Sequence, residues 1–143
     1  MRAIILAGLL LFMAAPVLAA NLDTKSGKEV AAKEAYELSE KCAKSAAEFV
    51  QEKYKDWGGT VTDYTNHYNR KLNKCFVNVT FIYGFARAGE TDKGLWDVNE
   101  NKRYGEFDDG LFHRDSPDIC EMLGTPCKSK SEWDAMAKPY MDE

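Results

Sequence analysis

The sequence predicts a small α+β domain in which one long helix packs on an antiparallel sheet of about four strands, followed by a short C-terminal helix. Three observations lead to this prediction. Residues 28–54 contain no proline or glycine and carry apolar side chains at helical spacing. Residues 64–83 read as two strands joined by a polar turn, and the second strand alternates cleanly. Four cysteines follow an apolar leader, which is typical of an exported chain with two disulfides.

The leader has the features of a cleaved signal peptide. Arg2 supplies a positive charge, residues 3–15 form an apolar core, and Val17-Leu18-Ala19 suits cleavage as well as Ala20 does. A membrane anchor is the alternative, but this apolar run is shorter than the roughly 20 residues of a membrane span. We expect residues 1–20 to be removed and residues 21–143 to form a single periplasmic or secreted domain, with no stable membrane insertion after cleavage.

The charge balance argues against nucleic acid as a partner. The chain has 19 basic and 23 acidic side chains, a net charge of −4, which becomes −5 when Arg2 is lost. An acidic domain is poorly suited to bind phosphate backbones or anionic membranes. A protein or small-molecule ligand of unknown identity is the expected partner.

All four cysteines lie beyond the leader, and three connectivities are possible. We predict Cys42–Cys75, because the first lies in the apolar stripe of the helix and the second on the apolar face of a strand. The remaining pair, Cys120–Cys127, encloses the turn-rich segment EMLGTP. The chain lacks the C-x₂-C pairs of zinc sites, so neither a metal nor a cofactor is expected.

The long helix is predicted to begin near Lys28, with Ser26 as its cap and Glu29 completing a capping box. Trp57-Gly58-Gly59 should end it. Its small and apolar side chains recur at steps of three and four, so they form one stripe that faces the sheet. The stripe consists of Ala31, Ala35, Leu38, Cys42, Ala46 and Phe49.

Two hairpins account for the four predicted strands. The first has the turn Arg70-Lys71-Leu72-Asn73, and the second has a turn over residues 99–102. In the second strand one face is apolar and is expected to lie under the helix. That face carries Cys75, Val77, Val79, Phe81 and Tyr83.

The C-terminal part of the chain is predicted to be less regular. Residues 108–126 are rich in Asp, Gly and Pro and are expected to form an irregular loop held by the small disulfide. Ser129 and Ser131 are both candidate caps of the last helix. Its apolar stripe starts at Trp133, and Pro139 should end or kink it early.

The densest cluster of polar and aromatic side chains is Tyr64 to Asn69. His67 is the candidate general base in this cluster, since imidazole titrates near neutral pH. Strict alternation, however, places Val61, Asp63 and His67 on one face of the strand and both Tyr64 and Tyr68 on the other. No nucleophile stands beside the histidine, and a polar hairpin edge explains the same residues.

Other candidate sites have equally plausible structural explanations. Residues 97–108 begin like a calcium-binding loop but have Lys102 where that loop needs glycine, so an Asn-rich hairpin turn is the alternative. His113 would need carboxylates to complete a metal site. Trp57, Trp96 and Trp133 could line a binding face or pack in the core.

The functional prediction is a non-enzymatic binding or interaction module that uses Tyr64, His67, Tyr68 and Trp96. One alternative is an acidic inhibitor of a basic enzyme such as a cell-wall hydrolase, docking through residues 106–121. Another is a small hydrolase that uses His67. The sequence contains no phosphate loop, cofactor motif or catalytic signature that points to a known family.

Overall fold

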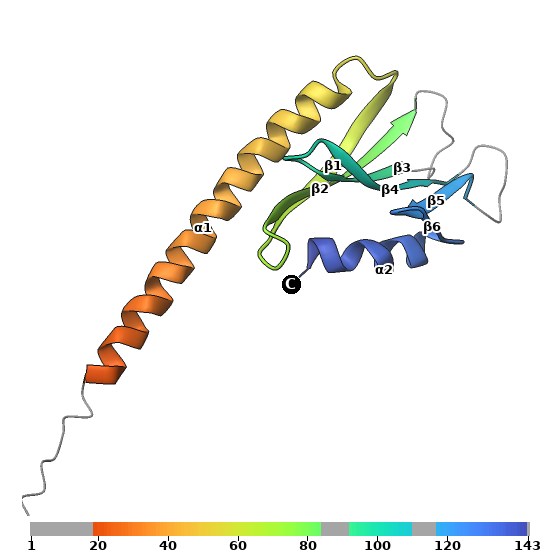
Figure 1. Ribbon diagram of the computed structural model, residues 1–143. Coiled ribbons are helices and arrows are strands. Elements are labelled where there is room, and N and C mark those ends of the chain that lie inside the picture. The colour runs from red at the N-terminus through yellow and green to blue at the C-terminus, as the bar shows by residue number, and fades with distance from the viewer. Residues whose placement is uncertain (1–18, 84–91, 110–116, 143) are drawn as a thin grey trace, which may run out of the picture. The chain divides into compact units, whose positions relative to one another are not determined.

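The computed structural model of the protein describes residues 19–83, 92–109 and 117–142 (Figure 1). The chain divides into two compact units, residues 1–33 and residues 34–143, which we describe separately. Among the described residues, no helix combines the length and the apolarity needed to cross a membrane.

The described part of the first unit is helical and belongs to α1 (Ala19–Tyr54). This helix begins before Lys28, so the prediction that Ser26 caps it is wrong. Serine and glycine within a helix cost at most about 1 kcal/mol each, and Ser26 and Gly27 are followed by an uninterrupted run of good helix formers. The predicted leader lies outside the described residues except for its last two positions, Ala19 and Ala20.

The second unit contains a six-stranded antiparallel sheet in which each strand pairs with the next along the chain. Both predicted hairpins are confirmed, and Asn73 and Asn101 adopt the positive φ angles that their turns require. The strands are β1 (Gly59–Asn69), β2 (Lys74–Tyr83), β3 (Asp92–Asp97), β4 (Lys102–Asp108), β5 (Ile119–Met122) and β6 (Thr125–Pro126).

The sheet therefore has two strands more than the predicted four. β5 and β6 lie in the segment that was expected to be irregular. They form a minimal hairpin whose turn has positive φ at Leu123 and Gly124. The backbone N–H of Cys127 donates to Cys120 O at 2.8 Å, so the small disulfide closes a paired hairpin.

β1 contains a bulge that changes which side chains share a face. Val61 lies opposite Phe81 and Asp63 lies opposite Thr80, so Thr62 is the extra residue. The prediction that Val61 and Asp63 share a face is therefore wrong, because one inserted residue reverses the alternation. Val61 instead packs on the helix-covered face of the sheet.

One face of the sheet is covered by α1 (Figure 1). The predicted apolar face of β2 is confirmed there, with Val77 and Val79 fully buried. The buried stripe of the helix continues beyond the predicted one to Val50 and Tyr54, whereas Ala31 is exposed. This first core consists of Ala46, Val50, Tyr54, Val77, Val79 and Phe81.

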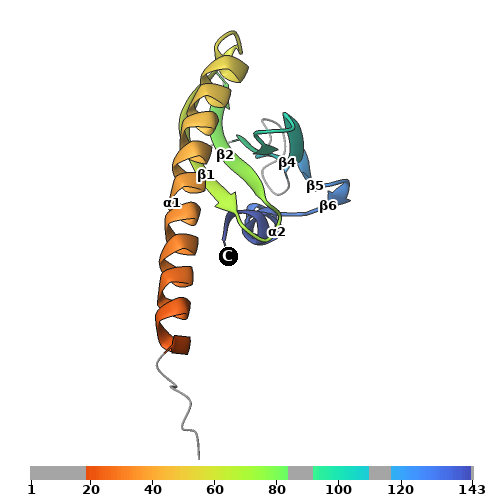
Figure 2. The same cartoon turned by 60° about the vertical axis from the view of Figure 1, so that its left-hand side comes forward.

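The opposite face is covered by α2 (Lys130–Met141), so β2 lies between the two helices (Figure 2). Ser129 is the N-cap and accepts from the backbone N–H of Glu132, as predicted. The second core consists of Phe76, Leu95, Phe107, Met122, Trp133 and Ala137.

Pro139 does not end α2 early, which corrects the prediction. It lies in the last turn, where its missing N–H removes one intrahelical bond and the ladder closes after it, because Asp142 N–H donates to Lys138 O at 2.8 Å. The side-chain amide of buried Asn69 donates to Pro139 O at 2.9 Å, and its Oδ1 accepts from Leu72 N at 3.0 Å. One side chain thus joins the end of α2 to the β1–β2 turn.

Both predicted disulfides are confirmed. Cys42–Cys75 joins α1 to β2 with a Cα–Cα distance of 5.3 Å, and Cys120–Cys127 joins β5 to the end of its hairpin at 5.0 Å. Both distances lie in the usual range for disulfides. The sequence separations of 33 and 7 residues imply different contributions to stability.

We expect removal of the longer disulfide to cost more stability than removal of the shorter one. Replacing Cys42 and Cys75 together by Ala should lower the free energy of unfolding by about 4 kcal/mol, and replacing Cys120 and Cys127 by about 2.5 kcal/mol. Urea unfolding of the two double variants measures both values. Equal losses would contradict the loop-entropy argument.

We also expect Asn69→Ala to lower the free energy of unfolding by about 2 kcal/mol, because it leaves buried backbone groups of α2 and the turn without partners. Asn99→Ala is the control, since Asn99 is exposed and its replacement should change stability by less than about 0.5 kcal/mol. Urea midpoints of the two variants test this, and an unchanged Asn69→Ala midpoint would show that the bonds to α2 contribute nothing.

Candidate ligand-binding site

The four residues predicted to form a binding site do not converge in the structure. Tyr64 and Tyr68 lie on the α1-facing side of β1, whereas His67 lies opposite Phe76 on the side covered by α2. Trp96 lies on β3 and lines a separate pocket. Only the last of the four is therefore placed in a built cavity with other aromatic side chains.

His67 is half-buried, and its Nε2 atom is buried with no hydrogen-bond partner among the described residues. A general base needs a proton donor within hydrogen-bonding reach and a group that orients its ring. Tyr68, its neighbour in the chain, donates instead to Asn73 in the turn. The hydrolase hypothesis gains no support from this geometry.

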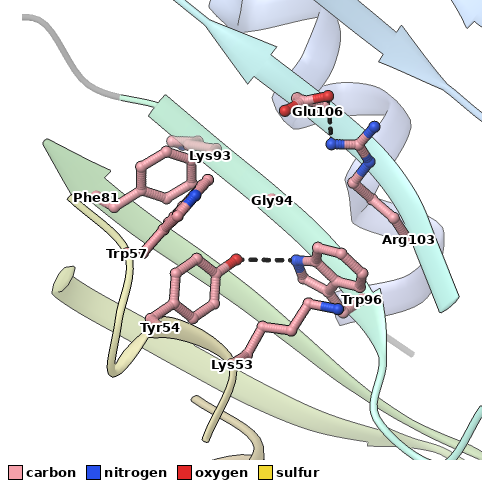
Figure 3. A pocket seen from close by; sticks show the side chains of 9 residues that line it. All are labelled: Lys53, Tyr54, Trp57, Phe81, Lys93, Gly94, Trp96, Arg103 and Glu106. Atoms are coloured by element: carbon pink, nitrogen blue, oxygen red, sulfur yellow. Dashed lines mark hydrogen bonds and ion pairs between the residues drawn. The ribbon is translucent and has the colours of Figure 1, made fainter. Parts of the chain in front are cut away.

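An aromatic pocket of about 180 Å³ lies between the end of α1 and strands β2, β3 and β4 (Figure 3). Its walls are mainly aromatic, and basic side chains stand around them. The lining residues are Lys53, Tyr54, Trp57, Phe81, Lys93, Gly94, Trp96, Arg103 and Glu106.

Gly94 makes room for this pocket. A Cβ atom at this position would lie 2.8 Å from Trp96 Nε1 and 3.4 Å from the Tyr54 hydroxyl. The absence of a side chain lets the indole N–H of Trp96 donate to the hydroxyl oxygen of Tyr54 at 3.0 Å, as Figure 3 shows. This bond fixes two rings from different elements against each other.

Trp57 forms the opposite wall with Phe81. Their ring centroids are 4.5 Å apart, and the centroid of Trp57 lies 4.8 Å from that of Tyr54. The backbone N–H of Trp57 donates to Tyr54 O at 3.3 Å, so the chain turns at the end of α1 and brings the indole back over the pocket. Trp57 keeps 38% of its surface exposed, which leaves an apolar ring accessible to a ligand.

A second bulge places two charged side chains beside the pocket. Leu95 lies opposite Gly105 and Trp96 lies opposite Arg103, so Tyr104 is the extra residue of β4. Arg103 and Glu106 consequently share the α1-facing side, where they form an ion pair. The Arg103 guanidinium lies 6.0 Å from the ring centroid of Trp96.

Lys53 contributes a cation whose charge is not neutralised by an acidic partner among the described residues. Its ammonium donates to Asn101 Oδ1 at 2.9 Å and stands 4.1 Å from the ring centroid of Trp96. Lys93 differs, because its ammonium is paired with Asp134 of α2 at 2.7 Å. The accessible positive charge of the pocket is therefore that of Lys53.

Two carboxyl groups face each other beyond the pocket. Asp92 is 8% exposed and lies opposite Asp108 on β4 and opposite Phe81 on β2. Burial, the charge of Asp108 and a hydrogen bond with that carboxyl raise the pKa of Asp92 to about 7. Two carboxyl groups that are hydrogen-bonded to each other favour a shared proton over two free carboxylates.

The remaining candidates of the sequence fall outside the pocket. Asp97 is fully buried, pairs with Lys74, and accepts from the backbone N–H groups of Asn99 and Glu100. The oxygens of Asp97 therefore bond within a hairpin turn, which is the arrangement predicted as the alternative to a calcium loop. Within the described ranges, no group of three or more potential metal-binding side chains occurs.

Trp133 is fully buried in the second core and does not share a face with Trp57 and Trp96. His113 lies outside the described residues, as does Asp115 of the acidic segment. Five acidic residues of segment 106–121 are described on or near β4 and β5. They are Glu106, Asp108, Asp109, Asp118 and Glu121.

Comparison of the chain with protein-family models, with curated proteins and with solved structures finds no match. The function can therefore be inferred only from the site itself. Sequence reasoning missed several site residues, among them Lys53, Tyr54, Phe81, Gly94 and Arg103. The one local signal was Gly94, because glycine within a strand often marks the close approach of another group.

The acidic pair predicts a pH dependence. The pKa of Asp92 is about 7 in the folded protein, whereas its ordinary value, taken for the unfolded chain, is 3.8. Between these two pH values folding is accompanied by the uptake of a proton. The stability that Asp92 contributes through its raised pKa is therefore complete below pH 3.8 and is lost as the pH rises to about 7. Asp92→Asn, which cannot ionise, should be stabilised relative to the wild type at about pH 8 and much less so at about pH 4. Urea midpoints of both proteins measure this difference, and a pH-independent difference would refute it.

Proposed function

We propose that the protein is an exported, non-enzymatic binding domain whose pocket takes a single aromatic ring that carries an acidic group. The observation that carries this proposal is the pocket itself, in which aromatic walls from α1, β2 and β3 stand beside the unneutralised charge of Lys53. Apolar walls with few placed polar groups are typical of small-molecule sites.

Export is supported by the two disulfides and by the signal-like leader. Disulfides persist in the periplasm and outside the cell, whereas cytosolic thiols are kept reduced. The described cysteines are all paired. We therefore propose a periplasmic or secreted location.

The size of the cavity limits the ligand. A protein cavity of about 150 Å³ holds one benzene molecule, and the pocket measures about 180 Å³. One six-membered ring fits, and a second fused ring would have to extend out past Trp57. The ring would stack on the indole and phenyl walls, which tolerate any flat apolar group.

The charge of the pocket favours an acidic substituent over a basic one. A cationic ligand would compete with Lys53 and Arg103, both of which already lie over the Trp96 ring. A carboxylate placed near Lys53 would replace the neutral amide of Asn101 as its acceptor. Charged hydrogen bonds are stronger than those to neutral groups.

Phenylacetate is the probe for this proposal, with phenylacetamide as its neutral counterpart. In NMR titrations we expect phenylacetate to shift the indole N–H signals of Trp57 and Trp96 but not that of Trp133, which lies in the other core. Phenylacetate should bind about fivefold more tightly than phenylacetamide, as expected for one exposed ion pair of about 1 kcal/mol.

Lys53→Met should abolish this preference, because it removes the charge and keeps the apolar stem. Lys55→Met is the matched control, since Lys55 is exposed and paired with Glu52 at 2.9 Å but does not line the pocket. It should retain the fivefold preference. Unshifted signals of Trp57 and Trp96, or equal binding of the two probes by the wild type, would overturn the proposal.

A further inference from the structure

β1 is an outer strand of the sheet, and its free edge is unusually suited to pairing. Among the described residues, it pairs with β2 alone. Residues 63–69, which follow its bulge, continue in regular register with β2 and contain neither lysine nor proline. Natural edge strands commonly carry such residues, or bulges, because an unprotected edge recruits another strand.

Three side chains along this edge are exposed, and His67 is half-buried. Tyr64 is 38% exposed, and both Asp63 and Thr65 are exposed. Asp63 lies opposite Thr80 of β2, Thr65 opposite Asn78, and His67 opposite Phe76. These three β1 side chains therefore share one face of the sheet. Tyr64 and Asn66 share the other face.

We propose that a second copy of this chain pairs antiparallel with β1 about a two-fold axis at Thr65. In this register Asp63 of each copy lies opposite His67 of the other, and the two Thr65 side chains lie opposite each other. Tyr64 of each copy lies opposite Asn66 of the other on the α1-facing side. A two-fold pairing of this kind is isologous, so each of these contacts occurs twice.

The sequence of the edge is self-complementary in this register. Asp63 is the only acidic residue of β1, and it is placed opposite the only imidazole of the strand. Thr–Thr pairs stabilise neighbouring strands by a few tenths to about 1 kcal/mol, and a carboxylate can accept a hydrogen bond from an imidazole N–H. A register centred on His67 would instead place two imidazoles together, with Asp63 opposite residue 71 of the other copy, which lies in the hairpin turn and outside β1.

This inference is independent of the aromatic pocket, which lies between α1 and strands β2 to β4. It accounts for the cluster Tyr64 to Asn69, which that pocket does not use. The contact is short, so a weak dimer in the micromolar range is expected rather than an obligate one. Failure of phenylacetate to bind would leave the proposed dimer unaffected, and absence of the dimer would leave the proposed ligand site unaffected.

Thr65→Cys tests the register directly in the exported protein. Cα atoms of directly opposed residues in antiparallel strands are about 4.5–5.5 Å apart, which a disulfide can bridge. Thr60→Cys is the matched control, because Thr60 is also an exposed threonine of β1. Two copies of residue 60 would lie about 33 Å apart in this dimer.

We expect oxidised Thr65→Cys to form a cross-linked dimer at least about tenfold faster than Thr60→Cys at equal concentration, with native Cys42–Cys75 and Cys120–Cys127 pairing verified by mass mapping. Equal rates for the two variants would overturn the proposal. So would sedimentation of the wild type as a monomer at every concentration up to about 500 µM.

A charge exchange provides a second test that does not add a cysteine. Asp63→Lys should weaken the wild-type dimer about fivefold or more, because it removes the carboxylate acceptor opposite His67 and puts an ammonium, which cannot accept, in its place. Combining it with His67→Asp should restore the association. A dimer that is unaffected by Asp63→Lys would refute the proposed register.

Discussion

The structure depends on β2 being buried on both faces at once. Its odd-numbered residues, from Cys75 to Phe81, face α1, while Phe76 faces α2. A slip of one residue would exchange the two faces, so the register of this strand is strongly specified. The Cys42–Cys75 disulfide fixes the same choice covalently. The apolar stripe of α1 then packs on the face that carries Val77 and Val79, and that of α2 packs on the face that carries Phe76.

This part of the architecture was predictable because its signals are local. Alternation over residues 74–83 and the stripe around Cys42 can be seen within short windows of sequence. The disulfide pairing followed from matching those two faces. β5 and β6 could not be predicted in the same way, since strands of four and two residues are too short to show periodicity. Their pairing depends on β4, Cys120 and Cys127, which come together only in the folded chain.

The candidate site was less predictable, because tertiary structure assembles it from four elements. Trp57 and Trp96 were identified as candidates for a binding face, but nothing near them in the sequence indicates that Tyr54 is hydrogen-bonded to Trp96 and in tilted ring contact with Trp57. Asp92 and Asp108 are 16 positions apart in the sequence and become neighbours only through the β3–β4 register. A cross-strand pair of like charges is invisible until that register is known.

The two bulges decide which side chains are available for binding. If β4 alternated strictly, Arg103 and Glu106 would lie on opposite faces, and the pocket would lose its ion pair. The extra residue Tyr104 places both on the α1-facing side, with Arg103 opposite Trp96 and Glu106 opposite Gly94. In β1, the extra residue Thr62 lets Val61 join the core while Asp63 faces the other way. Each bulge leaves one residue unpaired in the hydrogen-bond ladder and reverses the faces to which the residues after it point. The regular strands therefore build the scaffold, and the two irregular positions decide the faces on which Asp63, Arg103 and Glu106 lie.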